Sequence, residues 1–224
     1  MFVRQSLDPP LPAKYFRGTY KGLDAIVAVT GKDPVHGVDS VGTLAAGLTA
    51  QALLKMRKTD LILSVGSAGG FKRKGLKVGN VVFSSHVVNH DRRISPPHPD
   101  ANYARYGASL ADAVAVPKLL SLTKWHTGIV STGNSVADSE LDKKALQENG
   151  AMVKDMEAAA VAAVAKYHKT PFAAIKVVSD LLDGDDSDSF KDSFEGNLPK
   201  VAEILRDAVV TTLDFVTGKS VTQL

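Results

Sequence analysis

Apolar runs of strand length alternate with segments of helical periodicity along the chain. Continuous or nearly continuous apolar runs predict strands at 24–30, 59–67, 79–90, 125–132, 150–156 and 170–180. Apolar residues at helical spacing predict helices over 40–56, 138–149, 157–168 and 197–217, the last ending at Gly218. Strands that are apolar throughout and separated by helices are typical of a sheet covered on both faces. We therefore predict an α/β fold.

No repeat, low-complexity segment or linker interrupts this pattern, so we predict a single domain over residues 1–224. The longest loop-like stretch, 92–107, contains prolines and aromatic residues, which indicates a functional or interface loop more than a spacer. Hydrophobic residues make up 44% of the chain, a composition that is typical of a globular protein with a full-sized core.

The composition excludes several classes of function. No apolar run reaches the roughly 18 residues that span a membrane, and we expect no signal peptide because the first residues lack an apolar core. The absence of cysteine excludes disulfides and thiol nucleophiles and fits a reducing compartment, so we expect a cytoplasmic protein. The net charge is only +3 and the basic residues are scattered, which predicts solvated surface and no nucleic-acid or membrane partner.

A glycine-rich stretch, "SVGSAGGF" (64–71), follows the apolar run that begins at residue 59. Its three glycines would let the backbone approach a ligand closely, and Ser67 adds a hydroxyl. Turns at the carboxyl ends of parallel strands commonly line ligand-binding sites. The stretch fits neither the phosphate-loop nor the dinucleotide-binding fingerprint, and a plain strand-to-helix turn is the alternative interpretation.

Two carboxylates open the apolar segment "VKDMEAAAVAAVAKYH" (153–168). Residues 158–165 are apolar on every side of a helix, which predicts a buried helix. Asp155 and Glu157 would be stabilised at its N-terminus by the helix dipole and the free N–H groups. The functional alternative is that Glu157 faces a ligand, because a carboxylate can accept two hydrogen bonds from the vicinal hydroxyls of a ribose. We expect Asp155 to be structural.

Asp180 stands where the strongest apolar run ends, in "AIKVVSDLLDG" (174–184). Burial raises the pKa of a carboxyl group, so such a residue can act as a general acid near neutral pH. An N-cap for the next segment is the alternative interpretation. The acids that follow at 183–188 do not have the spacing of a calcium loop and indicate a solvated loop.

A third polar cluster is "HDRRIS" (90–95), in which His90 and Asp91 could pair and Arg92 and Arg93 could bind an anion. A surface or subunit-contact network is the alternative. The six histidines show no metal-ligand spacing, and no G-x-S-x-G motif indicates a serine triad. We therefore expect no metal site.

Five motifs occur here in the order and spacing of a known family. They are "SVGSAGGF", "HDRRI", "STGNS", "KDMEAAAVA" and "KVVSDLLDG", which resemble the motifs of the 5'-methylthioadenosine/S-adenosylhomocysteine nucleosidases, in the purine nucleoside phosphorylase superfamily. Among members, "VDSVGT", "HDRRI" and "KDMEAAAVA" are most similar to the plant-type methylthioadenosine nucleosidases. The resemblance runs from about Tyr20 to the C-terminus and matches residues 1–20 poorly. It implies a three-layer, mixed but mostly parallel sheet between helices. It also implies a homodimer, a small nucleoside substrate, and no cofactor or metal.

The resemblance also implies roles for individual residues. Hydrolysis of an N-glycosidic bond passes through an oxocarbenium-like sugar, so an acid must protonate the leaving adenine and the ribose must be held. Asp180, supported by Ser179, would protonate adenine at N7, and Glu157 would hold the ribose hydroxyls with Met156 against the sugar. The further substrate-binding positions that the resemblance implies are Ser67, Ala68, Val41, Ile94, Val136, Lys176, and either Phe190 or Phe194. Lys176 stands where bacterial members carry arginine and plant members lysine.

Two departures from the family pattern are visible. Asn134 replaces the acid that members usually carry in "TGDS", which would alter polar contacts around the adenine. The family also begins with a buried strand followed by the glutamate that activates the attacking water, and neither is found before Asp24, where Asp8 is the only acid. We therefore expect the chain to lack a central strand and that general base, as an incomplete gene model, a splice product or a protein with lost activity would.

The leading hypothesis is a nucleosidase that releases adenine from methylthioadenosine in methionine salvage, with S-adenosylhomocysteine as an open second substrate. One alternative is a phosphorylase that uses phosphate in place of water. The other is a non-catalytic relative that binds nucleoside or serves as a storage protein. Phosphate dependence of base release separates the first two, and the third predicts no release of adenine.

Overall fold

The computed structural model describes residues 2–7, 10–92, 100, 102–103, 106, 110–183 and 190–224, with no side-chain description for 190–193. Its strands are β1 (Val3–Ser6), β2 (Lys14–Tyr20), β3 (Leu23–Val29), β4 (Ile62–Gly70), β5 (Val81–Asn89), β6 (Ala111–Asp112), β7 (His126–Thr132), β8 (Val153–Asp155) and β9 (Phe172–Leu181). Its helices are α1 (Thr43–Met56), α3 (Pro117–Thr123), α4 (Glu140–Glu148), α5 (Ala158–Tyr167) and α6 (Phe190–Val216), with short 3₁₀ helices η1 (Lys72–Lys74) and η2 (Val221–Gln223).

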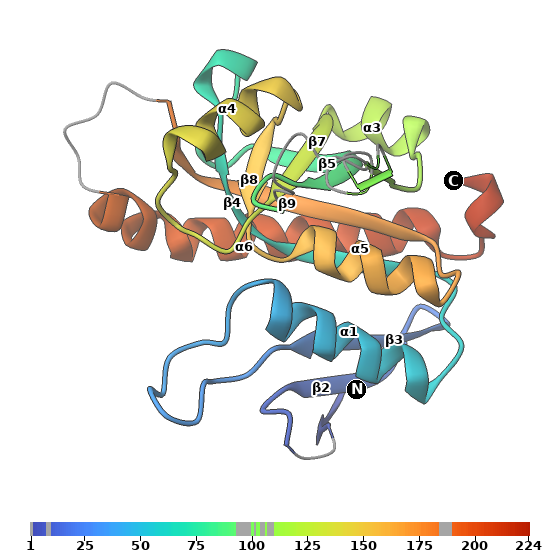
Figure 1. The fold of residues 1–224 in the computed structure, drawn as a ribbon. Coiled ribbons are helices and arrows are strands. Elements are labelled where there is room, and N and C mark those ends of the chain that lie inside the picture. The colour runs from blue at the N-terminus through green and yellow to red at the C-terminus, as the bar shows by residue number, and fades with distance from the viewer. Residues whose placement is uncertain are drawn as a thin grey trace.

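The larger sheet is mixed and has the strand order β6-β5-β7-β8-β4-β9. Its parallel pairs are β4 with β9, β5 with β7, and β7 with β8, whereas β8 runs antiparallel to β4. β5 also pairs with β9 in antiparallel fashion, so the sheet curves back on itself. Figure 1 shows helices on both sides of this sheet, which confirms the predicted α/β class.

Alternating side chains of β9 enter two separate hydrophobic clusters. Ala174 and Val178 pack in a cluster with α1 and α5, whereas Ile175 and Val177 pack in a second cluster with α3 and α6. Successive side chains of a strand point to opposite faces, so β9 is buried on both faces, as its continuous apolar run predicts. Small side chains let α1 and α5 approach closely: the Cβ of Ala160 lies 3.8 Å from where a Cβ on Gly47 would stand.

The first three strands form a separate antiparallel sheet in the order β1-β2-β3. It packs its own small cluster, around Leu7, Ala13 and Tyr15, against α1. The strand predicted at 24–30 is confirmed as β3, but it lies outside the larger sheet and pairs only with β2 among the described strands. Apart from buried Tyr15, the residues of β2 are partly buried or exposed, and no continuous apolar run marks this strand in the sequence.

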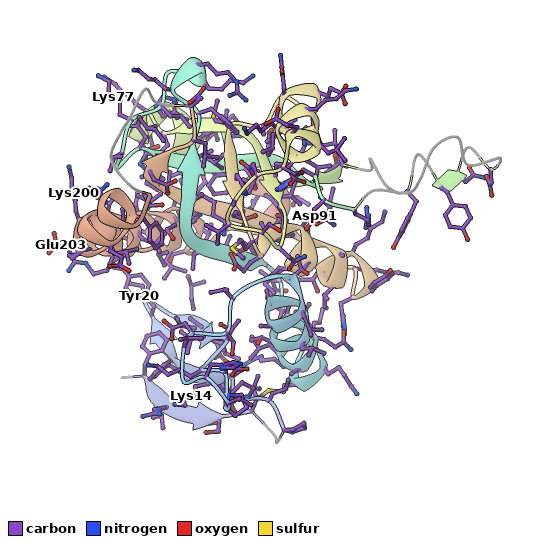
Figure 2. All side chains as sticks on the ribbon, turned by 60° about the vertical axis from the view of Figure 1, so that its left-hand side comes forward. Lys14, Tyr20, Lys77, Asp91, Lys200 and Glu203 are labelled. Atoms are coloured by element: carbon purple, nitrogen blue, oxygen red, sulfur yellow. The ribbon has the colours of Figure 1, made fainter. Side chains whose placement is uncertain are left out.

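The small sheet and α1 form the lower part of Figure 1, beneath α5. Two residues at the end of β2 connect this sheet to the C-terminal helix. The hydroxyl of Tyr20 donates to the Asp214 carboxylate at 2.8 Å, and the ammonium of Lys21 lies 2.7 Å from the same carboxylate. Figure 2 shows Tyr20 at the boundary between the small sheet and α6.

Most predicted elements are confirmed to within a few residues. The largest difference concerns α6, and α3 is a helix that was not predicted. α6 begins at Phe190, before the predicted start at 197, and it continues through Pro199. It ends just before Gly218, whose φ of +74° is the left-handed conformation that ends many helices. α3 has only seven residues and begins at Pro117, which is favoured at the first helical position.

Candidate functional site

A bulge in β9 places Ser179 and Asp180 beside the glycine-rich end of β4. Ala68 is level with Val178 and Gly69 with Asp180, so Ser179 is the extra residue of the bulge. The hydroxyl of Ser179 lies 2.7 Å from Oδ1 of Asp180 and 3.2 Å from the carbonyl oxygen of Ala68. From α6, the side-chain amide of Asn197 donates to the carbonyl of Ser179 at 2.8 Å. A buried serine therefore orients the Asp180 carboxyl.

Asp180 is only 5% exposed, and its surroundings favour the protonated form. Burial raises the pKa of its carboxyl group, while the hydrogen bond from Ser179 and the charge of Lys154 oppose that rise. The net shift of the pKa is upward. This is the environment that a general acid needs, and it fits the role that the sequence suggested for Asp180.

Lys154 is a positively charged residue of the candidate site that was not predicted from the sequence. It pairs with Gly69 from β8, while Asp180 pairs with Gly69 from β9, so the two charged residues lie in one row across three strands. Its buried ammonium donates to the carbonyl of Val136 at 2.8 Å and contacts the Asp138 carboxylate. A lysine inside an otherwise buried strand was the available signal, because an unpaired buried ammonium is costly.

Glu157 stands at the junction between β8 and α5, partly buried. Its Oε1 accepts from the backbone N–H of Gly42 at 3.0 Å, and its Oε2 accepts from that of Met156 at 3.3 Å. Because β8 is antiparallel to β4, residues 155–157 lead back along β4 toward Ser67. The carboxylate is thus fixed by two amides, and its remaining lone pairs are available to a ligand.

Asp155 and Lys176 form an ion pair inside the protein. The Lys176 ammonium lies 2.7 Å from Oδ2 of Asp155, and the two side chains are 1% and 0% exposed. Asp155 also accepts from the hydroxyl of Thr132 at 2.5 Å and from the backbone N–H of Ala158 at 2.8 Å. Asp155 is therefore structural, as expected. Lys176 is engaged by this pair, and its direct contact with a substrate stays a prediction.

The glycine-rich stretch 64–71 is strand, and our prediction of a turn was wrong. β4 continues through Gly70, so partly buried Ser67 and buried Ala68 are strand residues near its carboxyl end. A Cβ on Gly69 would come within 2.7 Å of Leu182, and one on Gly70 within 2.7 Å of Val178. A larger residue at either position would force these packed side chains to move, so packing over the strand accounts for the two glycines without a ligand.

The remaining predicted binding residues are either largely exposed, partly buried or outside the described residues. Val41 precedes α1 and is 63% exposed, and Val136 is 54% exposed. Ile94, Arg93 and Asp8 lie outside the described residues, and the side chain of Phe190 is likewise not described. Phe194, the alternative to Phe190, is partly buried in α6. The contacts between Asn134 and Thr43 and between Lys154 and Val136 bring the loop after β7 toward α1 and β8.

His90 and Asp91 bind separate partners. His90 is 4% exposed, and its Nδ1 lies 3.2 Å from the Ser131 hydroxyl. Burial lowers the pKa of its imidazole. Asp91 accepts instead from the backbone N–H of Asn134 at 2.7 Å, and the guanidinium of Arg92 stacks on Tyr106. His90, Asp91 and Arg92 therefore make contacts within the chain, and the predicted pairing of His90 with Asp91 is not seen.

Neither a metal site nor a membrane span emerges from the described part of the chain. No three potential ligands among histidine, aspartate and glutamate gather there, and no helix there is long and apolar enough to cross a bilayer. A surface cavity of about 240 Å³ lies away from Asp180, lined by Tyr15, Arg17, Ile26, Met56, Arg57 and Lys58. The candidate site is therefore defined by the chemistry around Asp180 and Glu157.

Comparison with known proteins identifies the class to which this fold and site belong. A family model described as the phosphorylase superfamily matches residues 5–214. The match begins before Tyr20, the position from which the resemblance could be followed in the sequence. The chain is a member of this superfamily.

Individual relatives narrow the assignment. The chain is 37% identical to the 5'-methylthioadenosine/S-adenosylhomocysteine nucleosidase of Arabidopsis thaliana, over 98% of its own length and 86% of the relative's. It is 38% identical to the 5'-methylthioadenosine nucleosidase of the same plant, over 99% and 82% of the two chains. The apo structure of an Arabidopsis thaliana 5'-methylthioadenosine nucleosidase superposes with a TM-score of 0.93, 37% identity and coverage of 100% and 90%. The chain therefore belongs to the 5'-methylthioadenosine/S-adenosylhomocysteine nucleosidase family.

Proposed function

We propose that this protein hydrolyses the N-glycosidic bond of 5'-methylthioadenosine, releasing adenine and the thioribose in methionine salvage. The proposal rests on the buried Asp180 carboxyl near the carboxyl end of β4. Ser179 orients this carboxyl, and burial raises its pKa. The names of the relatives give the substrate class. S-adenosylhomocysteine is the second candidate substrate, and we place the reaction in the cytoplasm.

In this reaction, Asp180 and Ser179 together carry out one proton transfer. Water adds to C1′ of the ribose as the bond from C1′ to N9 breaks, and adenine leaves after Asp180 delivers a proton to N7. Ser179 holds the Asp180 carboxyl in place. The proton of the attacking water passes to a carboxylate on the opposite face of the sugar, and we assign no residue to that role.

The binding residues that we propose are those that the resemblance to the family implies. We propose that Glu157 accepts hydrogen bonds from the ribose hydroxyls and that Met156 packs against the sugar. Ser67 and Ala68 would contact the substrate from β4, and the apolar positions Val41, Ile94 and Val136 would surround the purine and sugar. We keep Lys176 as a substrate-binding residue and Phe190 as the cover of the alkylthio tail, with Phe194 as the alternative.

Chromatography of the products tests this function. We expect purified protein to convert methylthioadenosine to adenine and free methylthioribose at the same rate with and without phosphate. A strict requirement for phosphate, with a sugar 1-phosphate as product, would show a phosphorylase. Saturable binding of methylthioadenosine in calorimetry without adenine release would show a non-catalytic relative.

Substitution of Glu157 by glutamine tests the ribose contact. The amide keeps the size of the side chain and one acceptor oxygen, but it loses the charge and half of the acceptor capacity. Hydrogen bonds to charged groups contribute about 1.5–3 kcal/mol, so kcat/KM is expected to fall by about 10–100-fold, with KM raised. Steady-state kinetics measure this effect, with Glu148→Gln on α4 as the control. A KM equal to that of the wild type would contradict the role of Glu157.

We also propose that residues 1–224 act as one domain and assemble as a homodimer. The contacts of Tyr20 and Lys21 with Asp214 support the single domain. The dimer is supported by a surface of exposed apolar side chains at and before the start of α1, which we call the α1 surface: Val35, Val38, Val41, Leu44 and Leu48. A contiguous exposed apolar surface is characteristic of a protein interface.

Charges on the α1 surface are expected to separate the subunits. Leu44 and Leu48 are 74% and 43% exposed and lie one turn apart on the same face of α1. We expect the double variant Leu44→Asp with Leu48→Asp to be monomeric at micromolar concentration, where the wild type is dimeric, because two carboxylates per subunit would be desolvated. Sedimentation velocity measures this. Leu122→Asp, at a 77% exposed position of α3, is the control. A dimeric double variant would place the interface elsewhere.

A further inference from the structure

The first turn of α1 is capped by residues from other segments of the chain. Gly42 occupies the N-cap position and offers no side-chain cap to the free N–H groups there. The N–H of Gly42 donates to Oε1 of Glu157 at 3.0 Å, and the N–H of Thr43 donates to Oδ1 of Asn134 at 2.9 Å. Two adjacent amides therefore connect α1 to the start of α5 and to the loop after β7.

Both the oxygen and the nitrogen of the Asn134 side-chain amide form hydrogen bonds. Oδ1 also accepts from the hydroxyl of Thr43 at 2.9 Å. On the other side, Nδ2 donates to Oδ2 of Asp91 at 3.3 Å, and the backbone N–H of Asn134 donates to the same oxygen at 2.7 Å. In Figure 2, Asp91 lies in the upper part of the molecule, above the segment that leads into α1.

The side-chain amide of Asn134 satisfies both of its neighbours. Its oxygen accepts from α1, and its nitrogen donates to the Asp91 carboxylate. An aspartate at 134 would keep the acceptor but would carry no proton for Asp91. Two carboxylates would then face each other, which is unfavourable for both.

We propose that Asn134 is a positioning residue that fixes the first turn of α1 between Asp91 and Glu157, so that the Gly42 amide orients the Glu157 carboxylate for substrate. The inference rests on the proposed function for the role of Glu157. It extends that function by explaining why an amide stands at 134: Asn134 acts through Thr43 and Gly42, without touching the substrate.

A charge swap tests this role. We expect Asn134→Asp to raise KM for methylthioadenosine by about 5-fold while kcat changes less than 2-fold, a size that corresponds to the loss of about one hydrogen bond. Adding Asp91→Asn is expected to restore KM to within 2-fold of the wild type. In the double variant, the amide of residue 91 can donate to the carboxylate at 134, while that carboxylate still accepts from Thr43.

Amide hydrogen exchange gives a second measurement that requires no activity. We expect the amides of residues 42–46 to exchange at least 3-fold faster in Asn134→Asp and to return to the rate of the wild type in the double variant. Asn80→Asp is the matched control, because Oδ1 of Asn80 accepts from the Lys77 amide in a remote turn and an aspartate keeps that acceptor. We expect Asn80→Asp to leave both KM and this exchange unchanged.

The outcomes separate this inference from the proposed function. Faster exchange that the second substitution reverses, together with the matching change in KM, supports the positioning role. Unchanged exchange in Asn134→Asp, or a raised KM that the double variant does not restore, overturns it. If the wild type releases no adenine, the proposed function fails, and the exchange rates still decide whether Asn134 fixes α1.

Discussion

Replacing Asp180 by asparagine is expected to lower kcat for adenine release by about 10²–10⁴-fold, the usual contribution of a general acid. Asparagine has nearly the same shape and can still accept from the Ser179 hydroxyl, but it has no proton to deliver to adenine. Because only the transition state requires that proton, KM should change by less than about 3-fold. Steady-state kinetics give both constants. Unchanged adenine release in this variant would disprove the assignment.

The pH dependence of the rate provides a second measurement on the same residue. Burial raises the pKa of Asp180, so its carboxyl stays protonated to a higher pH than an exposed aspartate. The rate should therefore fall as the pH rises through this raised pKa, and that decline should be absent from the residual rate of Asp180→Asn. Asp60→Asn, at an exposed position, is the control and should keep the kinetics of the wild type.

Replacing Lys176 by methionine is expected to cause the largest loss of stability, about 3–5 kcal/mol in the free energy of unfolding. Methionine fills a similar volume, but it leaves the Asp155 carboxylate buried without its counter-ion. Asp155 bonds Thr132 and the first amide of α5, so the junction that carries Glu157 should be affected as well. Urea denaturation measures the change in stability.

A double-mutant cycle isolates the ion pair from the change in packing. Adding Asp155→Asn to Lys176→Met removes the unpaired charge and keeps an acceptor for Thr132, so the double variant should be more stable than Lys176→Met alone. Lys143→Met, which removes an exposed lysine paired with Glu140, should cost at most about 1 kcal/mol. Equal losses for Lys176→Met and Lys143→Met would contradict a stabilising buried pair.

Local patterns predicted the larger sheet well because burial is visible in the sequence. The run at 170–180 is apolar on both sides, and it became β9, which is buried on both faces. The small sheet was not predicted, because β3 alone does not reveal its partner and β2 has no apolar run. The stretch 64–71 was read as a turn from its glycines, whereas those glycines make room for Leu182 and Val178.

Carboxylates near an apolar run are visible in a sequence, but their partners are not. Asp180 could be chosen as an acid because it ends a buried strand, and Glu157 because it begins a buried helix. The partners of Lys154, the contact of Asn197 with Ser179 and the contact of Gly42 with Glu157 could not be predicted, since each joins segments far apart in the chain. Asn134 was noticed as an unusual residue, and its contacts with Thr43 and Asp91 explain it.

The sequence by itself determined the α/β class, most of the strands and helices, the resemblance to a family, and the two carboxylates proposed to act on substrate. These features depend on hydrophobic periodicity and on residue type, which are local properties of the chain. The tertiary structure alone decided that Asp155 is paired with Lys176, that Asp180 shares a strand row with Lys154, and that Glu157 is held by the amide of Gly42. Each of these depends on which strands become neighbours, because burial and pairing set the charge state and orientation of a side chain.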